Sequence, residues 1–233
     1  ISSAGGASAA QPDNADAESA QPESNPGLVA EPRPDVTSPS TLGERIAQDQ
    51  PGNSIAIVIL LGMVVSVGAV LGVGVLEWRA SSKKSRRAHL TDGPGWLLPA
   101  VALVGLAVAS YLAYVELTQI EAFCGPVGDC NPVHESAYAK LFDVLPIGLL
   151  GVIGYILILV VWAVGRWGSG TLVDLAPVGL LGLALFGVLF SIYLTFLEPF
   201  VIGYTCSWCL ISAVAMTVIV WLVARPGWAA LWG

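Results

Sequence analysis

Two closely spaced pairs of cysteines are the residues of this sequence whose type and spacing favour chemistry. Cys206 and Cys209 form a Cys-x-x-Cys pair at the head of the apolar segment TCSWCLISAVAMTVIVWLVA. Cys124 and Cys130 form a second pair in the segment FCGPVGDC. Two thiols one helical turn apart are suited to thiol–disulfide exchange or to half of a metal site. Four thiolates around one ion would instead make a structural zinc site.

The segments that position these cysteines are predicted to be membrane helices. The 233 residues are 55% hydrophobic and only 12% charged, whereas about 25% of the residues of a soluble domain are charged. Apolar segments of roughly 20 residues are long enough to cross a bilayer as helices. We predict five spans, at residues 54–76, 96–118, 146–165, 175–197 and 207–224. Glu116 and Glu198 fall near the ends of two spans, where we expect them to lie at the membrane interface.

The first 50 residues have a different composition. They are rich in Ala, Ser, Pro, Asp and Glu, as in AQPDNADAESAQPESNPG. Such a segment cannot bury enough apolar surface to offset its chain entropy, so we expect disorder over residues 1–50. Its acidic residues contribute much of the net charge of −7, and we interpret them as a solvated tail rather than a binding site.

Basic residues set the predicted orientation in the membrane. The loop after the first span, WRASSKKSRRAHL, contains a cluster of Lys and Arg of the kind that stays on the cytoplasmic side. The apolar spans on both sides of it make a nucleic-acid-binding patch the weaker interpretation. Successive loops between membrane spans lie on alternate sides of the membrane. With the basic loop in the cytoplasm, all four cysteines are therefore predicted on the extracytoplasmic side. We therefore predict a multi-pass protein of the plasma membrane or the bacterial inner membrane.

This position favours redox chemistry over metal binding, because disulfides form and persist outside the cytoplasm. Cys206 is expected in the first turn of the last helix, where unpaired N–H groups and the helix dipole lower the pKa of a thiol. It is expected to face water, whereas Cys209, one turn deeper, would be nearer to a lipid-soluble oxidant. The ring closed by Cys124 and Cys130 contains Gly and Pro and suits a mobile shuttle.

The segment after Cys130 is predicted to lie at the membrane interface. In HESAYAKLFDVLP, Ala139, Leu141 and Phe142 lie among polar residues. This pattern favours a short amphipathic helix that covers the mouth of the helix bundle.

The motifs described above resemble the vitamin K epoxide reductase family in its bacterial form. The resemblance covers about residues 95–225 and includes CGPVGDC, SAYAKLF, PIGLLG and CSWC in that order. It implies an all-α membrane protein with a four-helix transmembrane bundle around a quinone, either ubiquinone or menaquinone, and an interfacial half-helix as a lid. Many bacterial relatives carry a fused thioredoxin-like domain, which we do not expect here, and the predicted first span is an extra N-terminal transmembrane helix outside the four-helix bundle.

The resemblance also implies roles for the cysteines and a serine. Cys206 and Cys209 take the active-site role, and Cys124 and Cys130 take the role of the loop shuttle. Ser136 matches the family's loop serine near the quinone head group. Loss of one such hydrogen-bond donor to a developing negative charge costs about 3 kcal/mol.

Further quinone contacts are expected from Cys209 and from two residues of the interfacial segment, Tyr138 and Phe142. Two patterns within the spans predict packing. Glycines at three-residue spacing favour close helix approach in the third span: Gly148, Gly151 and Gly154. Aromatic residues at helical spacing in the fourth span are interpreted as bundle core, with one or two as possible quinone contacts: Phe186, Phe190, Tyr193 and Phe196.

The function implied is that of a membrane thiol–disulfide oxidoreductase. It would reoxidise an extracytoplasmic DsbA-like partner of thioredoxin fold and pass electrons through the loop pair and the helix pair to a quinone, supporting disulfide bond formation. Two alternatives remain open: a vitamin K epoxide reductase in the strict sense, using the same residues, and a membrane scaffold stabilised by a metal bound to the four cysteines. No nucleic-acid partner and no catalytic metal are expected.

The expected domain organisation follows the composition. Residues 1–50 form a disordered acidic tail, and residues 51–94 form the extra transmembrane helix and a basic cytoplasmic loop. Residues 95–225 form the four-helix bundle, and residues 226–233 form a short tail.

Overall fold

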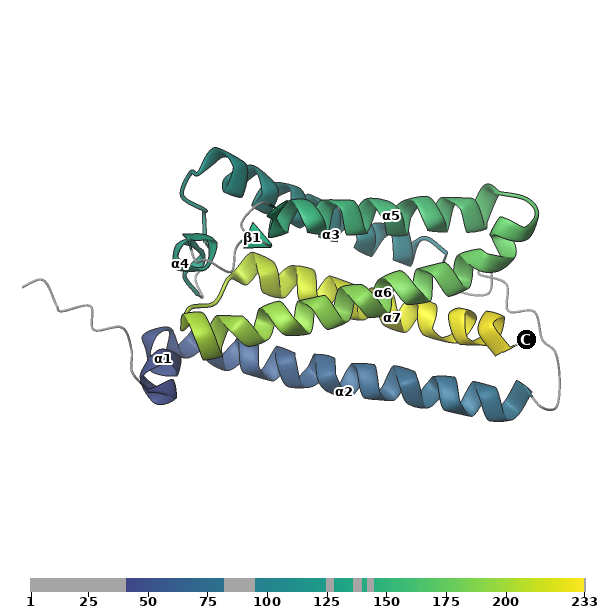
Figure 1. The fold of residues 1–233 in the computed structure, drawn as a ribbon, viewed down its shortest axis with the longest axis horizontal. Helices are drawn as coiled ribbons and strands as arrows, with labels where there is room; N and C mark the ends of the chain where they lie inside the picture. The colour runs from purple at the N-terminus through teal and green to yellow at the C-terminus, as the bar shows by residue number, and fades with distance from the viewer. Residues whose placement is uncertain (1–40, 82–94, 125–127, 136–139, 142–144, 233) are drawn as a thin grey trace, which may run out of the picture. The chain divides into compact units, whose positions relative to one another are not determined.

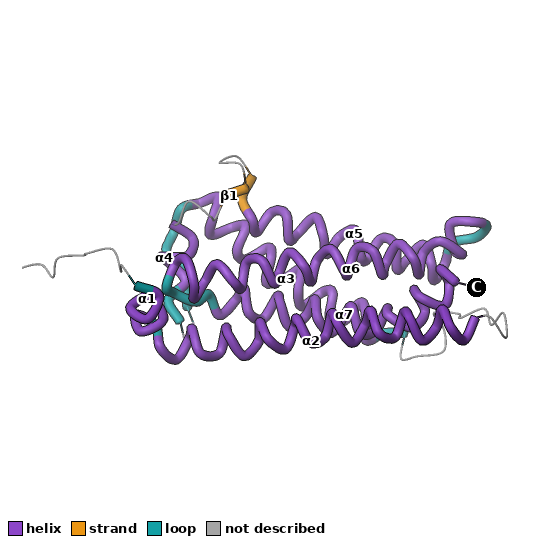
Figure 2. Tube along the Cα trace, turned by 60° about the horizontal axis from the view of Figure 1, so that its bottom comes forward, coloured by secondary structure: helices purple, strands orange, loops and turns teal. Residues whose placement is uncertain are grey.

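The computed structural model describes residues 41–81, 95–124, 128–135, 140–141 and 145–232, and this part of the chain is almost entirely helical (Figure 1). Long helices run side by side (Figure 2). In chain order the elements are α1 (Leu42–Gln48), α2 (Gln50–Ser81), α3 (Leu97–Thr118), α4 (Cys130–Glu135), β1 (Lys140–Leu141), β2 (Leu145–Pro146), α5 (Ile147–Trp167), α6 (Thr171–Leu197), the π-helical turn η2 (Glu198–Ile202) and α7 (Ser207–Trp232).

Five helical segments of the described chain are long and apolar enough to cross a membrane, as the sequence predicts. They are Gln50–Arg79, Leu97–Thr118, Ile147–Trp167, Thr171–Ile202 and Ser207–Trp232. The last one continues past the predicted end at residue 224, so residues 226–232 belong to α7 rather than to a separate tail. Tertiary contacts support this extension, because the Trp228 indole N–H donates a hydrogen bond to the carbonyl of Val70 at 3.0 Å.

The end of the segment expected to be disordered is ordered in the structure. Thr41 and Glu44 form a capping box at the start of α1, in which each side chain accepts a hydrogen bond from the other residue's backbone N–H. The Arg45 side chain donates to the carbonyl of Val201 in η2. A contact with a segment about 150 residues away is not visible in local composition. Residues 1–40 of the expected tail lie outside the described residues.

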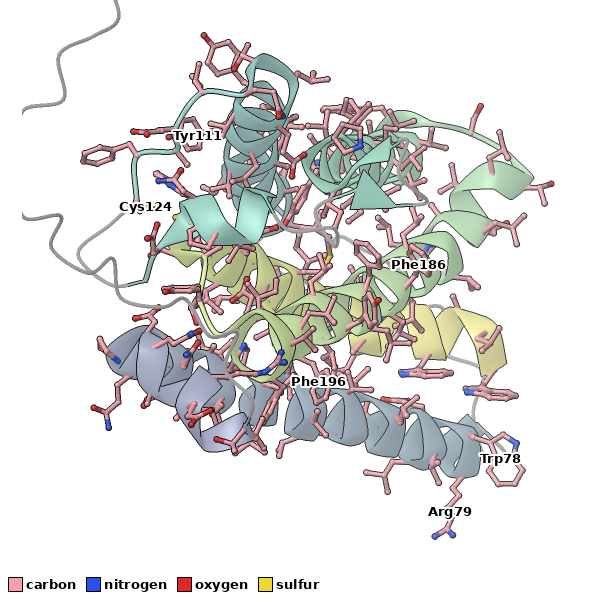
Figure 3. The ribbon with its side chains drawn as sticks, turned by 60° about the vertical axis from the view of Figure 1, so that its left-hand side comes forward. Trp78, Arg79, Tyr111, Cys124, Phe186 and Phe196 are labelled. Carbon is pink, nitrogen blue, oxygen red and sulfur yellow. The ribbon has the colours of Figure 1, made fainter. Side chains whose placement is uncertain are left out.

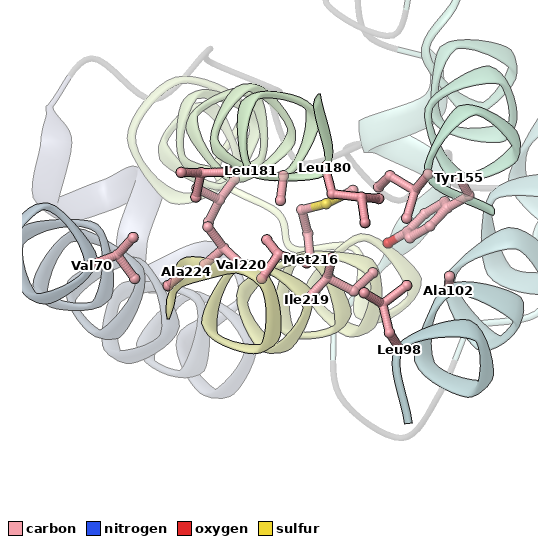
Figure 4. Packing of buried hydrophobic residues seen from close by; sticks show 14 of the residues in the cluster. Val70, Leu98, Ala102, Tyr155, Leu180, Leu181, Met216, Ile219, Val220 and Ala224 are labelled. Carbon is pink, nitrogen blue, oxygen red and sulfur yellow. The ribbon is translucent and has the colours of Figure 1, made fainter. Parts of the chain in front are cut away.

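Helices α3, α5, α6 and α7 contact one another in a closed cycle, and α2 packs against α6 and α7. The main core contains Val70 of α2, Leu180 and Leu181 of α6, and Ile219 and Val220 of α7, all buried (Figure 4). Burial of these apolar side chains leaves the ends of the helices free to carry polar and reactive groups.

Small residues allow close helix approach at two of the three predicted glycines. A Cβ atom on Gly148 would lie 2.5 Å from the backbone nitrogen of Ala113, and one on Gly151 would lie 3.1 Å from the Cβ of Ala109. Gly154 has no such neighbour within 4 Å. The glycine pattern therefore predicts the α3–α5 contact but not every position in it.

The interpretation of the aromatic residues of the fourth span as bundle core is wrong for three of them. Phe186, Tyr193 and Phe196 are 64%, 51% and 47% exposed, while Leu180 and Val188 of the same helix are fully buried. Lipid solvates apolar side chains as well as a protein interior does, so hydrophobicity does not tell which face of a membrane helix points inward.

The predicted interfacial helix is not continuous. Residues 130–135 form α4, but Lys140–Leu141 form β1, which pairs antiparallel with β2 in the register Lys140↔Pro146. A strand needs extended backbone, so a single helix across this segment is wrong. Residues 136–139 and 142–144 lie outside the described residues.

The helix directions place the cysteines and three arginines, Arg79, Arg166 and Arg225, at opposite ends of the helices. Helices α5 and α7 begin near the cysteines and carry Arg166 and Arg225 in their distal parts. Trp78 and Arg79 at the end of α2 likewise lie far from Cys124 (Figure 3). The helices therefore alternate in direction, as the sequence predicts.

Candidate active site

Cys206 is the residue that precedes α7, and Cys209 lies in the first turn of that helix. The carbonyl of Cys206 accepts the backbone N–H of Leu210 at 3.1 Å, and its Sγ accepts the backbone N–H of Cys209 at 3.4 Å. Cys206 is 0% exposed, so the expectation that it faces water is wrong.

The second pair is also held by backbone hydrogen bonds. The Sγ of Cys124 accepts the N–H of Cys130 at 2.9 Å and donates to the carbonyl of Ala122 at 3.4 Å. Cys130, the first residue of α4, is fully buried, whereas Cys124 is partly exposed. The more accessible sulfur of this pair is therefore that of Cys124.

The loop that carries Cys124 is fastened to α3 and α7. The Trp208 indole N–H donates to the carbonyl of Phe123 at 2.9 Å, and the N–H of Phe123 donates to the hydroxyl of Tyr111 at 2.9 Å. The rings of Tyr111 and Trp208 pack at a centroid distance of 5.0 Å. Trp208, which lies between Cys206 and Cys209 in the sequence, thus holds the loop pair close to the helix pair.

The two pairs meet through a hydrogen bond between the side chains of Cys130 and Cys206. Both side chains are fully buried, in a cluster with Val108, Leu112 and Val115 of α3. All four cysteines are thiols in this structure. The loop pair and the helix pair therefore contact each other through the side chains of Cys130 and Cys206.

The surroundings raise the pKa of these thiols. Burial is the main cause that raises the pKa of Cys124 to about 11. The hydrogen bond with Cys206 and burial raise the pKa of Cys130. The hydrogen bond with Cys130 lowers the pKa of Cys206, but the hydrogen bond with Cys209, burial and the charges of Cys209 and Glu198 raise it well above its ordinary value. The predicted lowering by the helix terminus is wrong because these effects outweigh the dipole.

A cavity of about 200 Å³ lies between α3, α5, α6 and α7, and Cys209 is part of its wall. Most of the wall is apolar, including Leu112, Ile147 and Met216. Phe186 and Phe190 of α6 also border it. An apolar cavity with a thiol at its wall and a few polar groups fits a quinone ring and its apolar chain.

Two polar groups of the cavity wall have defined partners. The Oε2 of Glu116 accepts the N–H of Gly148 at 2.8 Å, at the start of α5. The hydroxyl of Tyr155 is 3.0 Å from that of Ser212, and it donates to the Ser212 carbonyl at 3.1 Å. These residues shape the cavity and give it a small number of hydrogen-bonding groups.

Glu198 is a site residue that the sequence predicts only as an interfacial acid. It is 2% exposed, and its carboxyl group is hydrogen-bonded to the backbone N–H of Cys206 and to the side chain of Cys209. Its Oε2 atom has no hydrogen-bond partner among the described residues. The signal that points to it is an acid inside an apolar span, which in membrane proteins is by default functional.

Residues before the extra helix α2 and in its first turn hold the loop in front of Cys206. Asn53 is fully buried; its side-chain nitrogen donates to the carbonyl of Gly203 at 2.8 Å, and its side-chain oxygen accepts the hydroxyl of Thr205 at 2.8 Å. The Oδ2 of Asp49 accepts the N–H of Thr205 at 3.3 Å. The sequence contains no local signal for these contacts, which join residues more than 150 positions apart.

The structure brings Cys124, Cys130, Cys206 and Cys209 together at one end of the helices. Ser136, Tyr138 and Phe142 lie outside the described residues. No group of three or more His, Cys, Asp or Glu side chains in the described chain has an arrangement suited to a metal ion.

Comparison with known proteins gives a family match. The model of the Vitamin K epoxide reductase family matches residues 96–224, more than half of the chain. No curated protein and no solved structure matches the chain. The matched residues contain α3, α5, α6, α7 and all four cysteines, and they leave out α1 and α2. The family consists of membrane oxidoreductases that are generally linked to a quinone and a thioredoxin-fold partner. The chain therefore belongs to the vitamin K epoxide reductase family.

Proposed function

We propose that this protein is a membrane thiol–disulfide oxidoreductase that reoxidises an extracytoplasmic DsbA-like partner and passes the electrons to a quinone. The observation that carries the proposal is the contact between Cys130 of the loop pair and Cys206 of the helix pair. Thiol–disulfide exchange needs an attacking sulfur that reaches the sulfur it attacks, and a buried contact of this kind provides that reach.

The relay begins at Cys124, the accessible sulfur of the loop pair. A dithiol of the partner reduces a Cys124–Cys130 disulfide and itself becomes a disulfide. Cys130 then attacks Cys206 in a Cys206–Cys209 disulfide, which forms a Cys130–Cys206 mixed disulfide and releases Cys209 as a thiol. Attack of Cys124 on Cys130 closes the loop disulfide and leaves Cys206 and Cys209 both reduced. Two electrons have thereby moved from the partner to the helix pair.

The wall of the cavity supports a role of Cys209 as the thiol nearest to a quinone. When bound there, a quinone supplies the capacity to accept two electrons and two protons. The apolar side chains of α3, α5 and α6 would hold its ring and exclude water, and Ser212 and Glu116 would orient it. Ser136, Tyr138 and Phe142 keep their proposed roles as quinone contacts on the family resemblance alone.

The proposal includes the arrangement in the membrane. We place residues 95–225 as a four-helix bundle around the quinone, with α2 as an additional span, in the plasma membrane or bacterial inner membrane. The cysteines are placed on the extracytoplasmic side, because the basic loop between α2 and α3 favours the cytoplasm.

The test is reoxidation of a reduced DsbA-like protein by the full chain in lipid nanodiscs, followed as quinol formation. We expect quinone-dependent turnover that Cys130→Ser and Cys209→Ser each lower by at least about 100-fold, because each interrupts the only sulfur path. Ser110→Ala, an exposed small side chain on α3, is the matched control and should keep wild-type turnover.

Three results would contradict the proposal. Turnover that survives in Cys130→Ser excludes the relay. Turnover of vitamin K epoxide without reoxidation of the partner protein favours the epoxide reductase in the strict sense. Bound zinc near one ion per chain, with no disulfide under native conditions, favours the metal-stabilised scaffold.

A further inference from the structure

The loop that carries Cys124 and Cys130 comes very close to two other segments of the chain at Gly128. A Cβ atom on Gly128 would clash with the carbonyl oxygen of Thr205 and would lie 3.6 Å from the Oδ2 of Asp49. Gly128 also has a φ of 84°, which a residue with a side chain rarely adopts. Three segments therefore meet here: the loop pair, the residues before α7, and the junction of α1 and α2 at the same end of the helices (Figure 1).

This contact is next to the position of sulfur exchange in the sequence. Gly128 is two residues before Cys130, and Thr205 is the residue before Cys206. The other end of the loop is fastened separately by the hydrogen bond from the Trp208 indole. A shift of the backbone at Gly128 or Thr205 therefore changes the distance between the two sulfur atoms that exchange.

Thr205 is held in place by residues that lie outside the region matched by the family. Its N–H donates to the Oδ2 of Asp49 at 3.3 Å, and its hydroxyl donates to the side-chain oxygen of Asn53 at 2.8 Å. The other oxygen of Asp49, Oδ1, accepts the N–H of Gly52 at 3.2 Å and so caps the start of α2. Thr205 is buried, so water does not compete for these hydrogen bonds. The extra helix thus sets the position of the Thr205 carbonyl against which the loop packs.

We propose that Asp49 and Gly128 are positioning residues for thiol–disulfide exchange between the loop pair and the helix pair. Asp49 holds the backbone of Thr205, and Gly128 allows the loop to approach that backbone closely enough for the sulfur atoms to meet. The inference rests on the proposed function, because it concerns the same exchange step. It adds that the junction of α1 and α2, which the family match leaves out, aligns the two cysteine pairs.

The test measures how readily Cys130 and Cys206 form a disulfide when they are the only cysteines left. The full chain with Cys124→Ser and Cys209→Ser, in lipid nanodiscs, is equilibrated with reduced and oxidised glutathione. Each protein disulfide that forms reduces one oxidised glutathione to two thiols, which take up the two protons that the cysteines lose. The ratio of disulfide to dithiol, counted by alkylation and mass spectrometry, gives the effective concentration of one sulfur at the other.

We expect Gly128→Ala to lower this ratio at least about tenfold, because a reacting group displaced by about 1 Å can lose about 100-fold in reactivity. Asp49→Asn should lower the ratio by a smaller factor. Asparagine caps a helix as well as aspartate does, so α2 keeps its first turn. Its NH₂ group, however, replaces one of the two carboxylate oxygens that accept the N–H groups of Gly52 and Thr205.

Gly170→Ala is the matched control. Gly170 has a φ of 77°, but a Cβ atom on it would have no neighbour within 4 Å, and it lies between α5 and α6 at the opposite end of the helices (Figure 1). This variant shares the backbone strain of Gly128→Ala without the clash, so it should leave the ratio unchanged. The helix pair alone is measured in a chain with Cys124→Ser and Cys130→Ser. Its ratio should change less than the ratio between the pairs.

An unchanged ratio between Cys130 and Cys206 in Gly128→Ala or in Asp49→Asn would overturn the positioning role of the residue that was replaced. An equal loss in Gly170→Ala, or within the helix pair alone, would also overturn the inference, because the effect would then not concern the alignment of the two pairs. If Cys130 and Cys206 form no disulfide at any glutathione ratio before these substitutions are made, the proposed function fails as well. The failure of the inference and the failure of the proposed function are thereby distinguished.

Discussion

At the scale of single residues, the main feature is that the reactive sulfurs are shielded from water. Cys130 and Cys206 are both fully buried, and only Cys124 of the loop pair is partly exposed. Burial and mutual hydrogen bonds favour the protonated thiols. Because the thiolate is the nucleophile, we expect such a site to react slowly with oxidants in the solvent.

The pH dependence of Cys124 follows from its raised pKa. Far below a pKa of about 11, the thiolate fraction rises tenfold with each pH unit. We therefore expect the alkylation rate of Cys124 by a water-soluble maleimide, measured in a Cys130→Ser, Cys206→Ser, Cys209→Ser variant, to rise without a plateau up to about pH 10.

A peptide that contains one unperturbed cysteine is the control, and its alkylation rate should level off near pH 8.5. A plateau of the Cys124 rate at the same pH as the peptide would show that the loop does not shield this thiol.

At the scale of elements, the loop before Cys206 is held from outside the family-matched region. Asn53 joins the first turn of α2 to Gly203 and Thr205, and Gly203 has a φ of 89°. A side chain at Gly203 would clash with the side chain of Gln48, and the positive φ would strain the backbone of any residue other than glycine. The extra helix therefore positions the loop that leads into the Cys-x-x-Cys pair.

Asn53→Ala should destabilise this junction. It leaves the buried hydroxyl of Thr205 and the carbonyl of Gly203 without their partner, which costs about 1–3 kcal/mol for each unsatisfied group. We expect a lower thermal unfolding temperature in nanodiscs and faster alkylation of Cys206 in the variant than in the wild type.

Ser54→Ala, at the neighbouring exposed position, is the matched control and should change the free energy of unfolding by less than about 0.5 kcal/mol. Equal unfolding temperatures and equal Cys206 alkylation rates in the two variants would show that Asn53 does not support the loop.

At the scale of the whole molecule, the sequence predicts the number of spans and the grouping of the four cysteines at one end. The apolar segments determine the number of spans, because a chain that crosses lipid must satisfy its own backbone groups as a helix. The cysteines are grouped at one end because successive loops lie on alternate sides of the membrane. The sequence does not predict the burial of Glu198, Asn53 or Cys206. Their contacts join distant parts of the chain, and the outward position of Phe186 shows that apolar residues in a membrane can face lipid as readily as protein.

The most direct test of the central claim is the formation of a mixed disulfide between the two pairs. In a Cys124→Ser, Cys209→Ser variant, only Cys130 and Cys206 remain, and their contact predicts a nearly complete Cys130–Cys206 disulfide after mild oxidation, identified by mass spectrometry. The matched Cys130→Ser, Cys206→Ser variant retains Cys124 and Cys209 and should remain reduced under the same conditions. A variant that keeps Cys130 and Cys206 but forms no disulfide, or forms one no faster than the Cys124 and Cys209 control, would contradict the relay.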